Sequence, residues 1–509
     1  MVLISTPGSP ASAEALDTDR PLRGGLTLAA VQQHVAQQVA AQRPPLTAPV
    51  AHTQVLAQLL QRIEPVDFRQ QVGLLHDSDK LKRSHHVVVI AEEVLACAQR
   101  HGWDLCRNNN LLYAYNGTHW QELPADAVKA FLQQAAEKMG LDRYEARFVQ
   151  FGELLFTQFM STAYLAPPVR SRELVRINLF NGTFHISPEE QVLRPFAAAD
   201  FLTYQLPFAY EPARSAPRFQ KFLDRVLPDL ECQQVLAEYI GYLFVSPARL
   251  KLEKSLLLHG SGANGKSVFF EVITALLGPE NVSHYALQSL TLDPAYSRAN
   301  LAKVLVNYAS ELGGKLDANV FKQLVSGEPV EVRLPYGQPY TMSEYGKLLF
   351  NCNELPTDVE HTPAFFRRFL IVPFAQTIPV VEQDPHLATR IIQTELSGVF
   401  NWVLAGLHRL LGQGRFTESA RMQQQLEDYK TQADSVRSFL QEHGYQHTSE
   451  GVTSRAQLFT EYQGYCQEEG ARPVGGRNFT KRLESSGIEA VRRADGLYYR
   501  VQREAGAFL

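Results

Sequence analysis

The sequence has few cysteines, no long hydrophobic run and no excess of positive charge, and each absence excludes a class of protein. Its five cysteines form no CxxC pair, so a structural zinc site is not expected and the thiols are expected to be reduced. No apolar run approaches the roughly 20 residues that span a membrane. The N-terminus lacks the basic and apolar stretches of a secretory signal. We therefore expect a cytoplasmic protein with no membrane partner.

The charge balance is slightly acidic, with 49 Lys and Arg against 53 Asp and Glu and a net charge of −4. A protein that coats DNA is strongly basic, so that class is not favoured. DNA binding is still allowed, because a ring can line its channel with basic residues and keep an acidic exterior. Hydrophobic residues make up 45% of the chain, as in soluble globular proteins. At roughly 100–200 residues per domain, the length suggests about three domains.

The N-terminal half begins with a segment that differs in composition from the rest. Residues 1–50 are rich in Ala, Pro, Gln, Ser and Thr, which predicts a mostly disordered arm. Residues 51–230 mix helical and strand patterns, with Asn-Gly pairs at 116–117 and 181–182. Such pairs between short apolar runs are strong hairpin signals. We therefore expect an α+β domain over residues 51–230.

The rest of the chain divides into a strand–helix region, a connector and a tail. Residues 231–412 alternate short apolar strands with helices, which predicts a parallel sheet covered on both faces. Residues 413–432 are polar with helical spacing and are expected to form a helical connector. Residues 433–509 indicate helix, helix, helix, strand and strand. The expected fold class is multidomain α/β.

A nucleotide-binding motif stands between a predicted strand and a predicted helix. The sequence GSGANGKS at 260–267 fits GxxxxGK[ST] in full. Glycines let the backbone turn its N–H groups onto phosphate oxygens, and the helix that follows adds its positive end. Lys266 should reach the β- and γ-phosphates of ATP, and the Ser267 hydroxyl should bind Mg²⁺. The expected nucleotide contacts are Gly260, Ser261, Gly262, Ala263, Asn264, Gly265, Lys266, Ser267 and Val268.

Polar residues at the ends of two later strands are candidates for the hydrolysis chemistry. Glu311 ends KVLVNYASE and is the candidate to hold Mg²⁺ with Ser267 or to act as base. KLLFNCNELP ends with Asn351 and Asn353. We favour Asn353 to orient the attacking water, because it falls just past the strand. The alternatives are a solvated loop carboxylate and asparagines that only form a turn.

Two adjacent arginines precede the next strand, in TPAFFRRFLIVPF. Their position suggests an arginine finger that reaches the nucleotide of a neighbouring subunit. Arg367 and Arg368 are both candidates, and Arg368 is slightly favoured. The alternative is a surface ion pair.

The tail carries the pattern of a winged helix. Asp434 and Ser454 can cap its first two helices, and Asp495-Gly496 marks the tip of a terminal hairpin. Basic residues on the third helix and on the wing suit contacts with DNA phosphates and grooves. These candidates are Arg477, Lys481 and Arg482 on the helix and Arg492 and Arg493 on the wing. A winged helix that binds protein, with a solvated basic face, is the alternative.

With these residues placed, the chain resembles the superfamily 3 helicases, in particular the phage, plasmid and poxvirus primase-helicase group. The resemblance covers roughly residues 90–509. It rests on these segments in order: NLFNGTFHI, LTYQLPFAYEP, PRFQKFLDRVLPD, LAEYIGYLF, GSGANGKS, FKQLVSGEPVEVRLPYGQPYTM, LLFNCNELP, FFRRFLIVPF and ELSGVFNWVLAGL.

The resemblance implies an AAA+-type core, a hexameric ring with ATP sites between subunits, and 3′→5′ movement on single-stranded DNA. VEVRLPYGQPY is similar to the family's motif that forms a hairpin whose tip enters the pore. Arg333 and Tyr336 are then candidates to grip the DNA backbone and bases, with Lys322 a weaker one. A cation with aromatics on a hairpin tip suits such contacts, although an ordinary surface hairpin gives the same pattern.

The sequence departs from the family pattern at two places. Many members carry paired acids at the second strand, but here Ser310 precedes Glu311. Only about 80 residues precede the recognisable region, so a primase domain is not expected, and Asp77 and Asp79 only mimic a metal-binding DxD. The expected function is that of an ATP-dependent replicative DNA helicase of a phage, plasmid or integrated element, working with replication partners. The alternatives are an ATP-switched origin-binding protein and a primase-helicase.

Overall fold

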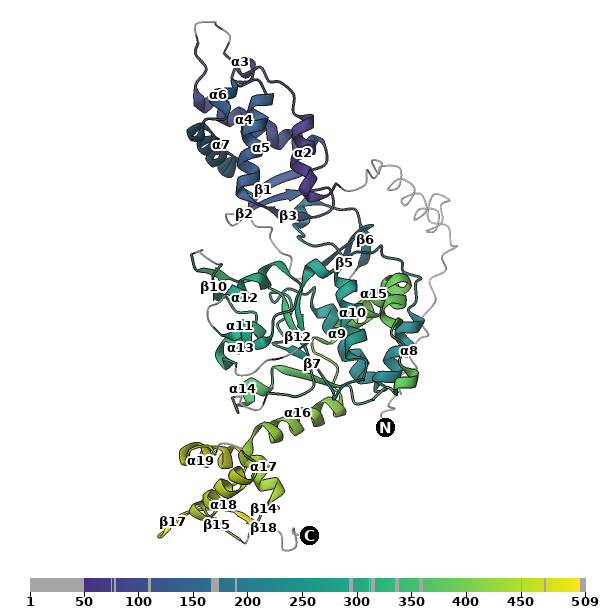
Figure 1. The fold of residues 1–509 in the computed structure, drawn as a ribbon, viewed down its shortest axis with the longest axis vertical. Coiled ribbons are helices and arrows are strands. Elements are labelled where there is room, and N and C mark those ends of the chain that lie inside the picture. Colours follow the sequence, from purple (N-terminus) through teal and green to yellow (C-terminus); the bar gives the residue numbers. More distant parts are fainter. Residues whose placement is uncertain are drawn as a thin grey trace, which may run out of the picture.

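The computed structural model describes residues 50–503, except 75, 77–78, 109–110, 166–173, 188–189, 293–295, 311, 313–315, 335–337, 357–359, 450 and 471–472. Figure 1 shows three parts along the long axis, with an N-terminal unit at one end, a central body, and a C-terminal unit at the other end. Of the arm expected at residues 1–50, residues 1–49 lie outside the described residues. Among those described, none of the helices is long and apolar enough to cross a membrane.

The N-terminal unit, residues 50–165, packs helices around a three-stranded antiparallel sheet of order β1-β2-β3. Its core includes the buried side chains of Leu59, Ile90, Leu132 and Leu155. Its elements are α2 (His52–Arg62), α3 (Phe68–Gln71), α4 (Arg83–Arg100), β1 (Asp104–Asn108), β2 (Leu111–Tyr115), β3 (Trp120–Leu123), α5 (Ala125–Lys138), α6 (Arg143–Ala146) and α7 (Val149–Thr162).

The hairpins expected from Asn-Gly and Asp-Gly pairs are present. Tyr115 pairs with Trp120 across the first loop, where the Asn116 side chain accepts hydrogen bonds from the backbone of Thr118 and His119. In two later hairpins, the glycine is the first residue of the second strand and is not part of the loop. Leu179 pairs with Gly182, and Arg493 pairs with Gly496. The turns therefore lie one residue earlier than the sequence predicts.

The central body begins with elements that share its core with the nucleotide motif. An antiparallel sheet of order β4-β5-β6 is followed by helices whose apolar side chains join the same hydrophobic cluster as β7. This core starts at Val175, earlier than the domain boundary near residue 230 that the sequence predicts. The elements are β4 (Val175–Leu179), β5 (Gly182–Ile186), β6 (Gln191–Arg194), η1 (Ala198–Asp200), α8 (Pro217–Val226) and α9 (Leu230–Tyr242).

A five-stranded sheet of order β13-β7-β12-β9-β8 runs through the central body, and every described pairing in it is parallel. Successive residues of a strand point to opposite faces. Leu256 and Leu258 of β7 join one hydrophobic cluster and Leu257 joins another. The predicted parallel sheet with two covered faces is thus confirmed. Its strands are β7 (Ser255–His259), β8 (Val282–Ser283), β9 (Val306–Ala309), β12 (Lys347–Cys352) and β13 (Phe369–Pro373).

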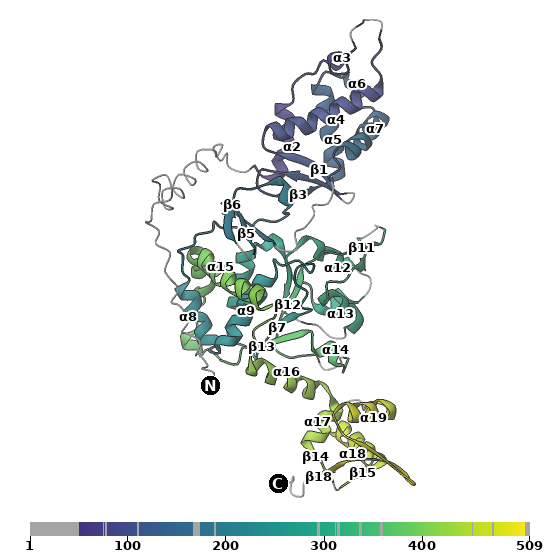
Figure 2. The same ribbon diagram turned by 180° about the vertical axis from the view of Figure 1, so that it is seen from behind.

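Helices cover the two faces of the sheet. Figures 1 and 2 place α8, α9 and α15 on one side and α11, α12 and α13 on the other. The hairpin expected near residues 330–342 is present, because β10 and β11 pair antiparallel. The elements are α10 (Lys266–Leu277), η2 (Pro279–Asn281), α11 (Leu287–Thr291), α12 (Tyr296–Ala299), η3 (Asn300–Lys303), α13 (Ala318–Val325), β10 (Val330–Val332), β11 (Tyr340–Met342), α14 (Pro363–Phe366), η4 (Val380–Glu382) and α15 (Leu387–Gln413).

Helix α16 (Ala420–Ala433) leads from the central body into the C-terminal unit, residues 434–503, which has its own hydrophobic core. The expected caps are present: Asp434 accepts from the backbone N–H of Val436, and Ser454 accepts from that of Gln457. The elements are α17 (Ser435–Glu442), β14 (Tyr445–His447), β15 (Thr453–Ser454), α18 (Arg455–Glu468), α19 (Gly476–Ser485), β16 (Ala490–Arg493), β17 (Gly496–Tyr499) and β18 (Val501–Arg503).

Candidate functional site

The glycine-rich loop leaves the carboxyl end of β7 and enters α10. Its backbone has positive φ at three of four consecutive residues, +112° at Gly262, +50° at Ala263 and +86° at Gly265. A run of this kind turns backbone N–H groups toward one concave surface, which suits an anion. Helix α10 starts directly behind the loop at Lys266, so its positive end faces the same space.

Two of the glycines have no room for a side chain. A Cβ on Gly260 would lie 2.4 Å from the carbonyl oxygen of Phe374 and 2.2 Å from Nδ2 of Asn264. A Cβ on Gly265 would lie 2.8 Å from the ring of Phe222 on α8. The loop therefore rests directly on the end of β13 and on α8, which hold its shape from behind.

Lys266 is 7% exposed and lies within the loop. Its ammonium donates to the carbonyl oxygen of Gly260 at 2.6 Å and to Oδ1 of Asn264 at 3.1 Å. Asn264 is itself fixed, because its amide donates to the carbonyl oxygen of Phe374 at 2.9 Å. Burial lowers the pKa of Lys266. The loop thus holds a single desolvated cation beside the concave face of its own backbone.

A pocket of about 1200 Å³ opens in front of the loop. Residues 262–268 line it, which include Ser267, whereas Gly260 and Ser261 are not part of the lining. The rest of the lining combines apolar side chains with cations. It consists of Arg218, Lys221, Phe222, Arg225, Val226, Asn353, Ile378, Val380, Glu382, Gln383, Asp384, Pro385, Leu387 and Arg390. The concave array of backbone N–H groups and the buried lysine suit the phosphates of a nucleotide, and the adjoining apolar wall suits its base.

The cations that α8 brings to this pocket were not foreseen from the sequence. Arg218 and Arg225 are paired with Glu395 at 3.1 Å and with Glu382 at 2.5 Å. Lys221, between them, is exposed and has no ion pair with the residues that the structure describes. The spacing of 218, 221 and 225 on one helix face was the available signal, but nothing local showed that the face meets the glycine-rich loop.

The two asparagines of β12 have different surroundings. Asn351 is buried in the sheet, where its Oδ1 accepts from the hydroxyl of Tyr308 at 3.1 Å. Asn353 is exposed and lines the pocket together with the glycine-rich loop. The structure thus brings Asn353, Lys266 and Ser267 to one pocket. Glu311, the expected acid after β9, lies outside the described residues.

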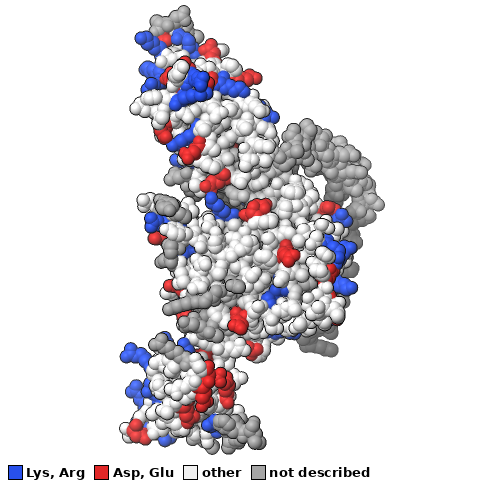
Figure 3. Space-filling model, viewed as in Figure 1, with Lys and Arg blue, Asp and Glu red and all other residues white. Residues whose placement is uncertain are grey.

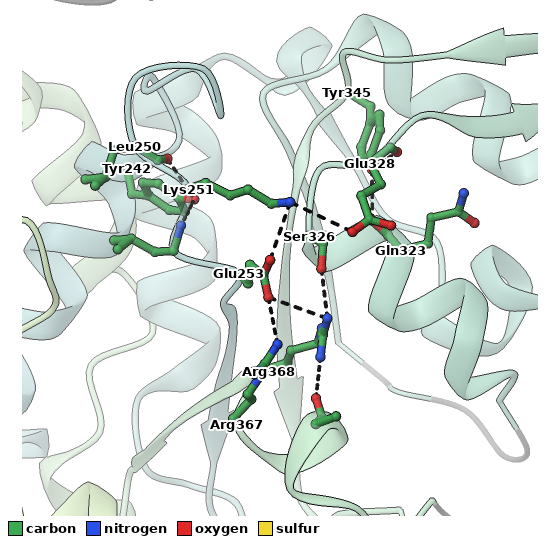
Figure 4. A network of polar contacts seen from close by, with 12 residues as sticks. Tyr242, Leu250, Lys251, Glu253, Gln323, Ser326, Glu328, Tyr345, Arg367 and Arg368 are labelled. Atoms are coloured by element: carbon green, nitrogen blue, oxygen red, sulfur yellow. Dashed lines mark hydrogen bonds and ion pairs between the residues drawn. The ribbon is translucent and has the colours of Figure 1, made fainter.

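The two arginines before β13 also differ. Arg368 is 7% exposed; its guanidinium bonds the hydroxyl of Ser326 at 2.9 Å and the carbonyl oxygen of Ala364, and lies 3.5 Å from Glu253. The Arg367 side chain is 64% exposed and, among the described residues, pairs with the same Glu253 at 3.3 Å. Figure 4 shows both guanidinium groups meeting Glu253. Arg368 is therefore buried and held by residues of its own chain, whereas Arg367 is exposed.

The arginines and the glycine-rich loop lie at opposite edges of the sheet. In the parallel pairing of β13 with β7, Phe369 stands beside Ser255 and Pro373 beside His259. The arginines precede Phe369, whereas the loop follows His259. Four strand residues, or about 13 Å of rise, separate these edges. Arg367 therefore lies at the edge of the sheet opposite to the glycine-rich loop of its own chain.

The candidate DNA contacts of the central body are only in part described. Lys322 on α13 donates to Glu360 at 2.8 Å. Arg333 lies just beyond β10 and is exposed. Tyr336, at the expected hairpin tip, lies outside the described residues.

On the face of the C-terminal unit that Figure 3 shows, most Lys and Arg atoms lie toward the side where Figure 1 places α19, and most Asp and Glu atoms lie away from it. Arg477 and Lys481 are one turn apart on α19 and exposed, as are Arg492 and Arg493 on β16. Arg482 differs, because it donates to the buried Asp434 at 3.2 Å.

Two family models match the chain. One, described as "D5 N terminal like", matches residues 89–228, and the other, described as a family of unknown function, DUF5906, matches residues 258–368. The second match contains the glycine-rich loop, β12 and the arginine pair.

Among solved structures, the chain is similar to "The A form apo structure of NrS-1 C terminal region-CTR", with 10% identity and a TM-score of 0.48, covering 84% of this chain and 100% of that one. It is also similar to "The apo structure of NrS-1 C terminal region (305-718)", with 11% identity and a TM-score of 0.44, covering 82% and 99%. At TM-scores below 0.5, neither similarity identifies the fold of this chain.

Proposed function

We propose that this protein is an ATP-hydrolysing DNA helicase with an AAA+-type core, and that it unwinds duplex DNA by 3′→5′ movement on single strands as a hexameric ring. The observation that carries the proposal is the glycine-rich loop between β7 and α10, with Lys266 buried against it and a nucleotide-sized pocket in front. Both family models are typical of phage and plasmid primase-helicase proteins, which supports a role in the replication of such elements.

In this proposal, each residue of the pocket has one task. Lys266 and the backbone N–H groups of residues 262–268 hold the phosphates, and the apolar wall with Phe222 and Leu387 receives the base. Ser267 and Glu311 would hold Mg²⁺, which supplies charge neutralisation at the transferred phosphoryl group when bound. Asn353 orients the attacking water.

The arginine finger in this proposal is Arg367, contributed by the neighbouring subunit. Its exposure and its place at the far edge of the sheet support this assignment, and Arg368 holds the finger's own segment to the sheet. A ring of heterologous contacts, each joining the arginine edge of one subunit to the pocket of the next, follows from this geometry.

DNA binding is assigned to two places. The hairpin of β10 and β11, with Arg333 and Tyr336, is proposed to grip the strand in the pore, with Lys322 nearby. The C-terminal unit is proposed to be a winged helix with α19 as its recognition helix and β16–β17 as its wing, because these elements carry the exposed cations Arg477, Lys481, Arg492 and Arg493.

The proposal is tested by measuring ATP hydrolysis with and without single-stranded DNA, together with strand separation on duplexes that carry a 3′ or a 5′ tail. We expect hydrolysis stimulated by single strands, and separation that needs the tail on which 3′→5′ movement can start. Nucleotide binding without DNA stimulation or unwinding would refute the helicase and favour an ATP-switched origin-binding protein.

Loss of the two exposed cations of α19 is expected to weaken duplex binding in a salt-dependent way. The double variant Arg477→Ala with Lys481→Ala should reduce the magnitude of the negative slope of log affinity against log salt by about 2, because each phosphate contact releases about one counterion. Fluorescence anisotropy of a labelled duplex over a salt series measures this slope.

Arg421→Ala is the matched control for this experiment, since Arg421 is exposed on α16 outside the C-terminal unit. It should leave the slope unchanged. If the double variant kept the wild-type slope, α19 would not be the DNA-binding helix.

A further inference from the structure

The chain between β12 and β13 links the two candidate catalytic residues that lie at opposite edges of the sheet. Asn353 stands at its beginning, in the nucleotide pocket, and Arg367 stands at its end, exposed beside Glu253. A change in the position of this chain would move both residues relative to the nucleotides they serve.

One side chain of helix α16 contacts the connection between β12 and β13 near both of its ends. Tyr429 is 1% exposed. Its hydroxyl donates to the carbonyl oxygen of Pro356 at 2.9 Å, three residues after Asn353. Its ring meets that of Phe366, the residue before Arg367, edge-on at 5.4 Å between centroids. The helix that leads to the C-terminal unit is thus in contact with both ends of the segment.

Asp434, directly after α16, connects the same chain to the recognition helix. It is 2% exposed and caps α17 by accepting from the N–H of Val436 at 3.0 Å. It also accepts from Arg482 on α19 at 3.2 Å and lies 4.0 Å from Nδ1 of His361. One buried carboxylate is therefore shared by the C-terminal unit and the central body.

Further contacts link the residues beside His361 to α14, the short helix before Arg367. Glu360, the neighbour of His361, accepts from Thr362 Oγ1 at 2.7 Å and from Lys322 at 2.8 Å. Thr362 in turn caps α14 by accepting from the N–H of Phe365 at 3.3 Å. Side-chain contacts, together with the peptide chain from Glu360 to Thr362, therefore connect α19 to α14, and Arg367 directly follows α14.

We propose that Asp434 is a positioning residue that couples DNA binding on α19 to the placement of Asn353 and Arg367. The inference rests on the proposed function. In this proposal, the Arg482 side chain changes its partner. It pairs with Asp434 when α19 is free of DNA, and with a DNA phosphate when α19 is bound to DNA. When Arg482 leaves, Asp434 keeps only its contacts with the N-terminus of α17 and with His361. The connection between β12 and β13, which carries Asn353 and Arg367, then shifts. Coupling of this kind is reciprocal, so nucleotide must also change the affinity for DNA.

Asp434→Asn tests the coupling with little cost to the fold. Asparagine caps helices as well as aspartate does, but it lacks the charge that holds Arg482 and faces His361. In the wild-type full chain, a non-hydrolysable ATP analogue should change the affinity for a labelled duplex about 5-fold or more. In the variant, this ratio should fall to about 1, while the affinity for the analogue and Tm stay near the wild-type values.

Glu461→Gln is the matched control, because Glu461 contacts Tyr445 and Gln457 inside the C-terminal unit. It should keep the wild-type ratio. Tyr429→Phe removes only the hydrogen bond to Pro356 and should reduce the ratio of the DNA affinities with and without the analogue. It replaces Asp434→Asn as the test if that variant lowers Tm strongly.

Three results would overturn the inference. In the first, Asp434→Asn or Tyr429→Phe keeps the full ratio. In the second, the wild type binds both the analogue and duplex, but neither ligand affects the other; the proposed binding functions would stand. In the third, the wild type binds no nucleotide at all, and the proposed function fails as well.

Discussion

Replacement of Lys266 by alanine is expected to reduce ATP hydrolysis by at least about 100-fold and to abolish strand separation, since it removes a preorganised charge aimed at the phosphates. The ammonium lies between the carbonyl oxygen of Gly260 and Oδ1 of Asn264, and no other lysine or arginine among the described residues belongs to the loop. Hydrolysis measured by phosphate release, with and without single-stranded DNA, gives the result directly.

The fold should survive this change, because Phe222 and Phe374 hold the loop from behind and remain in place when the lysine's bonds to the loop are lost. A Tm near that of the wild type is therefore part of the prediction. Lys129→Ala is the control, as Lys129 lies on α5 in an exposed pair with Glu153 and should leave hydrolysis unchanged. Substantial hydrolysis by Lys266→Ala would show that the loop is not the catalytic phosphate site.

Replacement of Arg367 by alanine is expected to reduce hydrolysis about 1000-fold, the contribution typical of an arginine finger, without a loss of stability. Its side chain is 64% exposed and, among the described residues, forms an ion pair with Glu253, so little folding energy depends on it. Steady-state hydrolysis at saturating ATP, together with Tm, separates the two effects.

A mixture of two inactive variants distinguishes a finger in trans from one in cis. Lys266→Ala supplies an intact Arg367, and Arg367→Ala supplies an intact loop. In randomly mixed rings at equal amounts, roughly a quarter of the sites combine an intact loop with a neighbour's intact finger, so activity should return to that fraction. No recovery after exchange of subunits would exclude Arg367 as a finger in trans.

Arg368→Ala is the matched comparison and should behave in the opposite way. It leaves Ser326 and the carbonyl oxygen of Ala364 without their guanidinium partner in a buried place, which should cost about 3 kcal/mol of stability. A large loss of Tm for Arg368→Ala and none for Arg367→Ala would agree with the assigned roles. A large loss of Tm for Arg367→Ala and none for Arg368→Ala would exchange the two roles.

The parts of the site that the sequence predicts are those written in a few consecutive residues. The glycine-rich loop, the helix Lys266–Leu277 and its stop at Gly278 follow from a local motif and local caps. The parallel sheet follows from short apolar strands separated by helices. Asp434 and Ser454 as caps follow in the same way, since a cap acts on the next turn of its own helix.

What the sequence could not predict depends on residues that are far apart along the chain. Arg367 and Arg368 are equivalent as neighbours, and only the positions of Glu253 and Ser326 make one exposed and the other buried. Arg482 resembles any cation of a recognition helix until Asp434 is placed beside it. Composition carries no information on such pairs.

In the proposed ring, the location of the candidate catalytic groups at opposite edges of the sheet also determines how activity grows with assembly. An open chain of n subunits has n − 1 complete sites, because the last arginine edge and the last pocket stay unmatched, whereas closure of the ring adds the final site without adding a subunit. A lone subunit has none. We therefore expect turnover per subunit to depend on the protein concentration and on ring closure, and a partner that opens the ring around a DNA strand to inactivate one site at the gap.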